Sequence, residues 1–380
     1  MAIKYLTKVN PGKLRGVALV RLDFNTDDAW RMDAALPTLK LISKYAKSIL
    51  IISHRGRPVF AKIPAGKPAG RFDGFDKKLS LRVNALQLQK KIGRKVKFLR
   101  NFKWDKIKKE LCFSPRGSVY LLENIRFLPE ESTPEPELAR RLAELADYYV
   151  NDAFPVDHHE SDSVSIVDKF LPSYAGLQLQ KEIENLSGVM NNPKHPLVLI
   201  VGGAKTADKL AVIKKLYNKA DHILFGGAAA NTVLKTMGVD VGDSLVDDKA
   251  DKKYLLRLAR SKKVVLPMDW AKENGAIYDI GPKTEELFAE KIKTARMIVW
   301  SGPMGQIEKK KFALGNLAVA RAIVKNKKAF SVTGGGETVS FLKKYKLDKK
   351  FSFVSTGGGA MLDYLAGEKL PGIEALKKSK

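Results

Sequence analysis

Strand-length apolar runs alternate with helix-length amphipathic segments along the whole chain, and this alternation restricts the possible folds more than any other feature. The pattern is typical of α/β proteins with parallel sheets, because a helix must carry the chain back before the next parallel strand can begin. The chain has 380 residues, more than a single hydrophobic core usually serves, so we expect two domains. The runs expected to form strands are residues 17–20, 48–52, 119–122, 197–201, 222–225, 264–267, 297–300 and 329–333.

One segment is expected to join the two domains. Residues 171–190 (LPSYAGLQLQKEIENLSGVM) place apolar side chains at helical spacing, and the Asn-Asn-Pro that follows would end a helix. We therefore expect one long amphipathic helix at 171–190, with the domain junction on it. Residues 60–78 are rich in Gly, Pro, Lys and Asp and have no periodicity, so we expect a loop there.

The charge of the chain requires its own explanation. The formal net charge is +27, which invites a nucleic-acid-binding interpretation because Lys and Arg side chains neutralise phosphates. Most lysines, however, stand in helix-like runs mixed with acidic or apolar residues, as in DKKYLLRLARSKK, and no aromatic-interleaved basic motif occurs. We expect most of them to lie on solvated helix faces and the rest to attract anionic substrates.

The apolar segments and the cysteine content set further limits. The first residues, MAIKYLTKVNPGK, contain no apolar stretch of signal-peptide length, and the most apolar segments are strand-sized, so we expect a cytoplasmic protein. Cys112 is the only cysteine, which excludes an internal disulfide and a metal site with several thiolate ligands. Its apolar flanks favour a position in the core.

Cationic and polar residues follow three of the expected strands in the first half. RLDFN at 21–25 is followed by Arg31, while SHRGRP at 53–58 and ENIRF at 123–127 close two further strands. Ligands of open α/β sheets bind beyond the carboxyl ends of the strands, and the fork of an Arg side chain matches phosphate and carboxylate. Together these motifs predict a pocket for an anion.

Glycine clusters follow expected strands in the second half, at 202–205 (GGAK), 334–338 (GGGET) and 356–359 (TGGG). Glycine lets the backbone approach a phosphate closely, and a following helix N-terminus adds unpaired N–H donors. Lys205 and Lys209 lie at the start of the expected helix TADKLAVIKKL, where two cations are unfavourable unless an anion lies between them. No GxxxxGKS or GxxxxGKT motif occurs, so we expect a nucleotide-phosphate site of another kind than the P-loop.

The order of short motifs along the chain adds a family resemblance. RLDFN, RMDAALPT, SHRGRP, LLENIRF, YYVNDAF, VGGAKTADKL, WSGPMG, GGGET and VSTGGGAMLDYL resemble phosphoglycerate kinases, and LPGIEAL near the C-terminus fits as well. The resemblance implies two Rossmann-like domains with parallel sheets joined by a long hinge helix at 171–190. Residues 1–170 with the tail 366–380 would bind 3-phosphoglycerate, and residues 191–365 would bind the nucleotide.

The resemblance also implies a reaction and the residues that carry it. A phosphoryl group passes reversibly between ATP and the carboxylate of 3-phosphoglycerate, giving ADP and 1,3-bisphosphoglycerate, with Mg²⁺ on the nucleotide. For 3-phosphoglycerate the resemblance implies Asp23, Phe24, Asn25, Arg31, His54, Arg55, Gly56, Arg57, Arg126 and His159. For the nucleotide it implies Gly203, Lys205, Lys209, Gly226, Gly227, Glu308, Gly335, Gly336, Glu337 and Thr338, with Glu337 also binding the metal.

Catalysis is expected to rest on alignment and charge rather than on a general base, because the acceptor is already a carboxylate. Arg31, Lys205, Gly335 and Gly358 are the residues expected to act on the transferring group. Because the two substrates are expected on separate domains, the domains must close about the hinge helix.

The chain departs from the family pattern at four places. His159 stands where an Arg usually completes the cage around the 3-phosphate; His158 is the alternative for this role. A histidine is cationic only below a pKa of about 6.5, so we expect substrate affinity to depend on pH. Glu337 replaces an Asp at the metal position, and Ser301 replaces an Asn near the nucleotide. Residues 268–279 are shorter than the family's loop, which trims the nucleotide rim.

Two other functions stay open on the sequence alone. The departures allow a non-catalytic homologue that acts as a scaffold, and the net charge allows a side role in nucleic-acid binding. The retained Arg31, Lys205, Lys209 and Glu308 favour an active enzyme. The family is typically monomeric, so we expect a monomer with no membrane partner and no specific nucleic-acid partner. The choice between ATP and GTP does not follow from the sequence.

Overall fold

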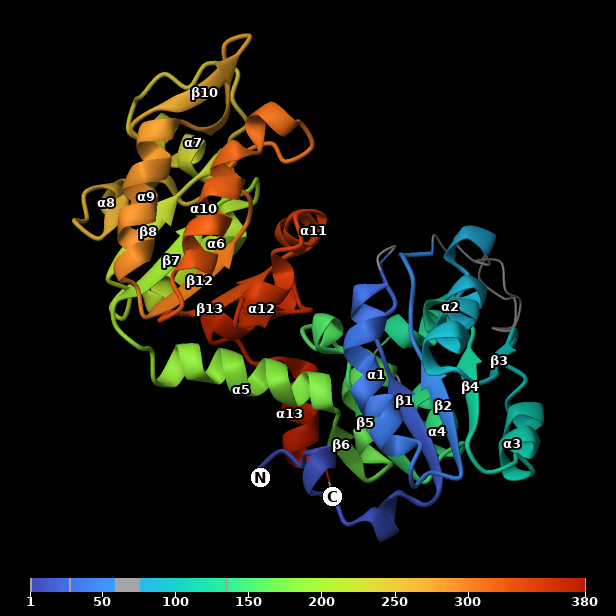
Figure 1. Ribbon diagram of the computed structural model, residues 1–380. Helices are drawn as coiled ribbons and strands as arrows, with labels where there is room; N and C mark the ends of the chain where they lie inside the picture. Colours follow the sequence, from blue (N-terminus) through green and yellow to red (C-terminus); the bar gives the residue numbers. More distant parts are fainter. Residues whose placement is uncertain (1, 27–28, 59–75, 134–135, 380) are drawn as a thin grey trace. The chain divides into compact units, whose positions relative to one another are not determined.

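The computed structural model describes residues 2–26, 29–58, 76–133 and 136–379. Contacts within the chain divide it into two compact units, which we call unit 1 (Met1–Ile183 with Lys369–Lys380) and unit 2 (Glu184–Glu368). The chain passes from unit 1 to unit 2 within the helix α5 (Leu177–Asn191) and returns to unit 1 for its last helix. Figure 1 labels the elements of both units.

Unit 1 is built on one parallel sheet. Its strands are β1 (Val17–Arg21), β2 (Ser48–Ile52), β3 (Val96–Leu99), β4 (Ser118–Leu122), β5 (Tyr148–Asn151) and β6 (Ser173–Ala175). In the described part of unit 1 these six strands lie in the order β3-β4-β2-β1-β5-β6. Every residue of β1 and β2 is buried, since helices cover both faces of the sheet. This burial explains the unbroken apolar runs of these strands.

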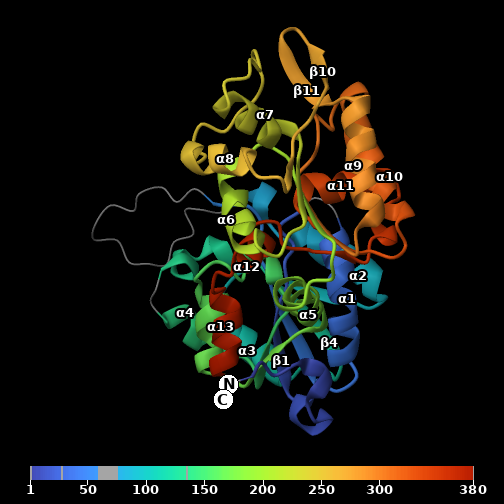
Figure 2. The same ribbon diagram turned by 90° about the vertical axis from the view of Figure 1, so that its left-hand side faces the viewer.

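Helices pack on both faces of the unit 1 sheet (Figure 1). They are α1 (Trp30–Ile42), α2 (Arg82–Ile92), α3 (Trp104–Cys112), α4 (Glu137–Ala143) and the C-terminal α13 (Pro371–Lys378). Ala18 and Val20 of β1 join one core cluster with α1 and α2, whereas Val17 and Leu19 join another with α3 and α4. The helix α13, seen in Figure 2, packs against η7, a π-helical turn at Asp162–Ile166 that also contacts α4.

Unit 2 repeats the design with a second parallel sheet. Its strands are β7 (Leu197–Val201), β8 (His222–Phe225), β9 (Val264–Val265), β12 (Met297–Ser301), β13 (Phe330–Gly334) and β14 (Phe353–Val354). Among the residues described for unit 2, they lie in the order β14-β13-β12-β7-β8-β9. In the centre of the sheet Ser301 pairs with Val201, so the glycine turns that follow β7 and β12 begin side by side.

Helices also cover both faces of the unit 2 sheet. They are α6 (Thr206–Leu216), α7 (Gly227–Thr236), α8 (Lys252–Ala259), α9 (Pro282–Thr294), α10 (Leu314–Lys325), α11 (Gly336–Lys344) and α12 (Gly359–Ala366). Ile200 and Trp300 pack with α9, α10 and α11, whereas Leu199 and Val299 face α6 and α12. Two α/β units with parallel sheets confirm the predicted fold class.

A short hairpin projects from the sheet of unit 2. The strands β10 (Trp270–Glu273) and β11 (Ala276–Ile280) are antiparallel, and Asn274 and Gly275 form the turn between them with φ of 47° and 79°. Positive φ at both turn residues is what a type I′ turn requires, and this turn matches the twist of the two strands. The shortened segment at 268–279 therefore folds as a compact ribbon.

The prediction of one helix over residues 171–190 is wrong at its start. Residues 173–175 form β6 and pair with β5, and the helix begins only at Leu177. The backbone N–H of Leu177 donates to Thr38 Oγ1 (2.9 Å), and that of Leu179 donates to Asp152 Oδ1 (2.9 Å). Helical spacing in the sequence could not show that residues 173–175 pair with β5, or that two side chains accept hydrogen bonds from the first turn of the helix.

Other local expectations met mixed outcomes. Each run expected to be a strand contains one, although β3, β5, β6, β14 and the hairpin were not predicted. Cys112 is exposed, so the expected core position is wrong. It is the last residue of α3, and the neighbouring Leu111 is the residue that is buried in the core. Most of the loop expected at 60–78 lies outside the described residues. No described helix is both long and apolar enough to cross a membrane.

Candidate functional site

Three strand ends in unit 1 are tied together by hydrogen bonds through polar side chains. After β1, the backbone N–H of Phe24 donates to Ser53 Oγ (2.9 Å), and Asn25 Oδ1 accepts from the N–H of Gly56 (2.7 Å). After β4, Asn124 Nδ2 donates to the carbonyl of Arg55 (2.7 Å). The loops after β1, β2 and β4 thus form one fixed surface at the carboxyl edge of the sheet, as expected for a ligand site.

Arginines of this surface bring positive charge to it. Arg31 forms an ion pair with Asp23 (Nη1 to Oδ2, 2.6 Å), and both side chains are largely buried. Arg126 donates from Nη1 to the carbonyl of Gly56 (3.0 Å), which holds its guanidinium near the loop after β2. Burial, followed by the nearby Arg21, lowers the pKa of Arg126 to about 10, so Arg126 remains a cation at neutral pH. The surface suits a bound anion.

Three histidines lie at the same edge. His54 is 1% exposed, and burial together with several surrounding cations lowers its pKa well below 6.5. The rings of His158 and His159 are in contact, with centroids 3.8 Å apart and their planes tilted by 40°. Burial and Arg126 lower the pKa of His158, and His159 is among the groups that lower the pKa of His54. Both members of the pair therefore lie near the cationic cluster.

The predicted substrate residues of unit 1 do not all have the expected role. Asp23, Asn25, Arg31, His54, Arg55, Gly56 and Arg126 meet through the contacts above. Arg57 is exposed, near enough to Arg126 to lower its pKa. Phe24 is 1% exposed and packs in the hydrophobic core, so its side chain is not available to a ligand. An aromatic residue between two polar ones at a strand end points inward by alternation.

In unit 2, three of the described helices begin at one cavity of about 370 Å³. They are α6, α11 and α12, and their N-caps are Lys205, Gly335 and Gly358. Gly335 has φ of 96°, a conformation that other residues rarely adopt. Helix N-termini carry unpaired N–H donors and partial positive charge, so this cavity is built for an anion. The predicted residues that line it are Gly203, Lys205, Lys209, Gly335, Gly336, Glu337, Thr338 and Gly358.

The lysine pair at the start of α6 adds full charges to this cavity. Lys205 is exposed, whereas Lys209 is 7% exposed and donates from Nζ to the carbonyl of Lys205 (3.0 Å). Burial lowers the pKa of Lys209, while the carboxylates of Asp208, Glu337 and Asp247 oppose this effect. Two lysines at a helix N-terminus oppose the helix dipole, and a bound polyphosphate would offset that cost.

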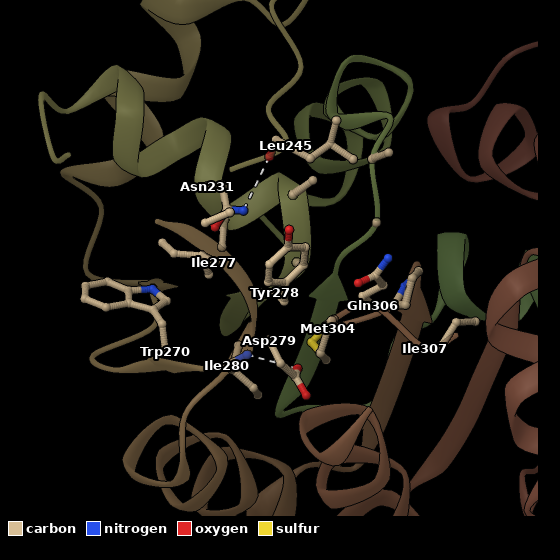
Figure 3. A pocket seen from close by; sticks show the side chains of 18 of the residues that line it. Asn231, Leu245, Trp270, Ile277, Tyr278, Asp279, Ile280, Met304, Gln306 and Ile307 are labelled. Atoms are coloured by element: carbon tan, nitrogen blue, oxygen red, sulfur yellow. Dashed lines mark hydrogen bonds between the residues drawn. The ribbon is translucent and has the colours of Figure 1, made fainter. Parts of the chain in front are cut away.

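A second cavity of about 540 Å³, which has large apolar side chains among its lining residues, adjoins the first and shares Gly203, Ala204, Pro303 and Glu337 with it. Figure 3 shows Trp270, Ile277, Tyr278 and Met304 around this cavity. The hairpin β10–β11 supplies the first three, and the turn after β12 supplies the fourth. Flat apolar walls next to a phosphate-binding cavity fit a nucleoside.

The remaining predicted nucleotide residues lie at this second cavity or beside it. Gly227 and the exposed Glu308 line it. Gly226 is not among the lining residues; it precedes Gly227 as the N-cap of α7, and a Cβ added to Gly226 would lie 2.5 Å from Met304 Sδ. Gly226 therefore lets Met304 pack closely rather than forming the wall itself.

The described residues fit a magnesium ion that the nucleotide brings with it. Glu337 lines both cavities, and Thr338 Oγ1 next to it is buried without a hydrogen-bond partner among the described residues. No group of three or more His, Cys, Asp or Glu side chains in the described part of the chain could hold a metal ion. Mg²⁺ is commonly bound by one or two carboxylates, phosphates and water, which needs no larger cluster.

Several residues of these sites were not predicted. Arg21, Ser53 and Asn124 stand inside quoted motifs, but their role is to fix neighbouring groups, and only the contacts in the fold reveal that role. Trp270 and Tyr278 carry no motif at all. The largely apolar run AIYDI at 276–280 was the available signal for Tyr278, although it does not say what the strand faces.

Comparisons with known proteins agree with this geometry. A family model described as phosphoglycerate kinase matches residues 15–368. The phosphoglycerate kinase of Dictyoglomus turgidum is 37% identical, with 99% of this chain and 100% of that protein aligned. That of Pseudothermotoga lettingae is 39% identical, with 95% and 96% aligned. Among solved structures, phosphoglycerate kinase from Coxiella burnetii has a TM-score of 0.82 at 32% identity and full coverage of both chains. The one from Pyrococcus horikoshii has 0.84 at 28% identity, with 99% of both chains covered.

Proposed function

This chain belongs to the phosphoglycerate kinase family, and on that premise we propose that unit 1 binds 3-phosphoglycerate and unit 2 binds ATP or ADP. The reaction is reversible phosphoryl transfer between ATP and the carboxylate of 3-phosphoglycerate, a step of glycolysis. One observation carries the assignment of the units: three helix N-termini and two lysines of unit 2 meet at a cavity, and the adjoining cavity has Trp270, Ile277 and Tyr278 in its wall. A nucleoside polyphosphate needs that pair of environments.

Unit 1 supports the other half of the proposal. Its cationic surface offers Arg126, Arg57 and the histidines to a phosphate. Asp23 and Asn25 would contact the hydroxyl and carboxylate region of the glycerate. His159 or His158 would close the cage where the family has an Arg.

Catalysis would then rest on positioning and charge. The carboxylate of 3-phosphoglycerate is itself the nucleophile, so no proton has to be removed. Arg31, held by Asp23, would orient that carboxylate, while Lys205 and the N–H groups at Gly335 and Gly358 would neutralise the phosphoryl group as it moves. Glu337 would hold Mg²⁺, which supplies charge neutralisation on the phosphates when bound.

The two proposed sites lie on different units, which has a mechanistic consequence. Transfer in line requires the reacting oxygen and phosphorus atoms to come into contact, so we infer that the units close on each other when both substrates are bound. Helix α5, within which the chain changes units, is the proposed hinge. We place the reaction in the cytoplasm and infer a monomer.

The proposal is tested by ATP consumption that depends on 3-phosphoglycerate, followed in a coupled assay. Lys205→Ala is expected to lower kcat by roughly 10² to 10³, the usual cost of removing one preorganised charge stabiliser. Lys262→Ala, an exposed lysine that lines neither cavity of unit 2, serves as the control and should leave the rate unchanged. A folded wild-type chain with no such activity would instead make the protein a scaffold.

A further inference from the structure

Arg21 at the end of β1 is a cation buried inside unit 1. Its side chain is 1% exposed, and its Nη1 donates to the carbonyl of Leu22 (2.6 Å). Its Nη2 lies 3.2 Å from His54 Nδ1. A guanidinium has only donors and does not lose its proton in proteins, so Nδ1 of His54 must be the acceptor in this contact. His54 is then neutral, with its proton on Nε2.

Arg21 cannot easily turn away from His54. Its Nε donates to Ser163 Oγ (3.0 Å), and Ser163 is itself held by Glu131, donating from Oγ to Oε1 (2.6 Å) and from its backbone N–H to Oε2 (3.0 Å). Glu131 is 2% exposed, and Tyr149 donates from its hydroxyl to the carbonyl of Ser163 (2.8 Å). A buried chain of contacts thus runs from Glu131 through Ser163 and Arg21 to His54.

The other ring nitrogen of His54, Nε2, is a hydrogen-bond donor with no acceptor among the described residues. This nitrogen is also buried. An unpaired buried donor is costly, and an acceptor atom of a bound ligand would remove that cost. Asp23 Oδ1 lies 3.8 Å from Nδ1, too far for a hydrogen bond. The charged groups around the ring that favour its neutral form are Arg21, Arg126, Arg31 and His159, after burial itself.

We infer that Arg21 is a positioning residue, which holds His54 in the Nε2–H tautomer so that the ring donates a hydrogen bond to a phosphate oxygen of 3-phosphoglycerate. The last part rests on the proposed function, whereas the tautomer does not. His54 is then a neutral, directional donor, and the arginines supply the positive charge that faces the phosphate. His54 should keep this role across the working pH range.

The tautomer can be read directly from the full-length wild-type chain. The sequence has five histidines, so ¹⁵N-histidine labelling with His54→Gln for assignment gives a tractable spectrum. We expect His54 to show the Nε2–H pattern from pH 5.5 to 8, and its Nε2 signal to shift on titration with 3-phosphoglycerate. An Nδ1–H pattern or an imidazolium in that range overturns the inference. Absence of kinase activity would refute the proposed function while leaving the tautomer result standing.

Variants separate positioning from a merely structural role. Arg21→Met removes the donor and the charge, so His54 should lose its tautomer preference and the KM for 3-phosphoglycerate should rise about tenfold or more, while the KM for ATP stays unchanged. Arg21→Lys, which keeps a charged donor, should recover part of this loss. Ser163→Ala is the milder variant if Arg21→Met does not fold, and it should broaden the His54 signals. An unchanged His54 spectrum in Arg21→Met or Ser163→Ala contradicts the inference.

Discussion

At the scale of single residues, the anion surface of unit 1 holds cations close together. Arg21 and Arg126 each affect the pKa of His54, and Arg21 and Arg57 both lower the pKa of Arg126. Placing like charges side by side in a partly buried site is costly, and a bound phosphate offsets that cost. Burial is the largest cause of both lowered pKa values and the neighbouring cations add to it, a combination that is common at functional sites.

The histidine pair leads to a prediction about pH. If His159 contacts the 3-phosphate as a cation, the KM for 3-phosphoglycerate rises between about pH 6 and 8 as the imidazole loses its proton, and His159→Arg flattens this rise. Burial and Arg126 lower the pKa of His158. If His158 is the residue that contacts the phosphate, the KM should therefore rise at a lower pH, below about 6.5. His158→Gln and His159→Gln, compared over the same pH range, distinguish the two. A flat wild-type profile would refute both versions.

Asp157 leads to a prediction about stability. It is wholly buried, and burial raises its pKa to about 7, in spite of the hydrogen bond donated by Asn151 Nδ2 (2.7 Å). The folded chain therefore keeps a proton that the unfolded chain loses near pH 4, so this group makes stability fall as pH rises from about 4 to 7. Asp157→Asn stays neutral and should raise the free energy of unfolding at pH 8 by roughly 1–3 kcal/mol, with a smaller gain at pH 5.

Thermal unfolding of Asp157→Asn at both pH values is the measurement. Asp105→Asn, at an exposed site on α3, is the control and should show no pH-dependent gain. The same change in melting temperature at pH 5 and pH 8 would argue against a raised pKa for Asp157. The carboxylates of Asp152 and Glu182 add to that raised pKa, so they are the next positions to vary.

At the scale of elements, the hairpin β10–β11 is the local structure that contributes most visibly to the proposed nucleotide site. It is a wall of the second cavity of unit 2, and its turn places Gly275 at φ of 79°. Gly275→Ala should strain the turn by about 1 kcal/mol. We expect a lower melting temperature and a several-fold weaker affinity for ADP, measured by calorimetry.

Gly188→Ala is the matched control for this prediction. Gly188 lies within α5, and a Cβ added there meets no heavy atom within 4 Å. Alanine favours a helix interior over glycine, so Gly188→Ala should keep or raise the melting temperature. An ADP affinity in Gly275→Ala equal to wild type would show that the hairpin does not shape the nucleotide site.

The elements also show what sequence reasoning can reach. Central strands such as β2 and β7 were predictable because burial on both faces makes them continuously apolar. The edge strand β3 was missed because only its two ends are buried and Lys97 is exposed. The start of α5 was misplaced because pairing of β6 with β5 is a tertiary contact.

The sites divide in the same way. Glycines and lysines at strand ends could be predicted, since their chemistry shows in the local sequence. The inward position of Phe24 was not anticipated, and the hairpin that carries Trp270 has no motif. The contact from Arg21 to His54 joins residues 33 apart in the chain, so only the fold reveals which nitrogen of His54 accepts.

At the scale of the whole molecule, the division into two units predicts a change of shape on binding. We expect the radius of gyration, measured by small-angle X-ray scattering, to fall when 3-phosphoglycerate and a non-hydrolysable ATP analogue with Mg²⁺ are both present, because the proposed transfer requires the two bound substrates to meet. Either ligand alone is the control. An unchanged radius in the ternary complex would count against closure.

The path of the chain has a consequence for biosynthesis. Unit 2 is a continuous stretch, Glu184–Glu368, whereas unit 1 needs both the first part of the chain and Lys369–Lys380 at its end. In the finished fold, Ser379 Oγ accepts from the N–H of Ser173 (3.1 Å), and Gly372 donates its N–H to the carbonyl of Asp157 (3.0 Å). The half that the ribosome makes first therefore stays incomplete until residues 369–380 have been made, whereas unit 2 is fully synthesised before that segment and can fold ahead of it.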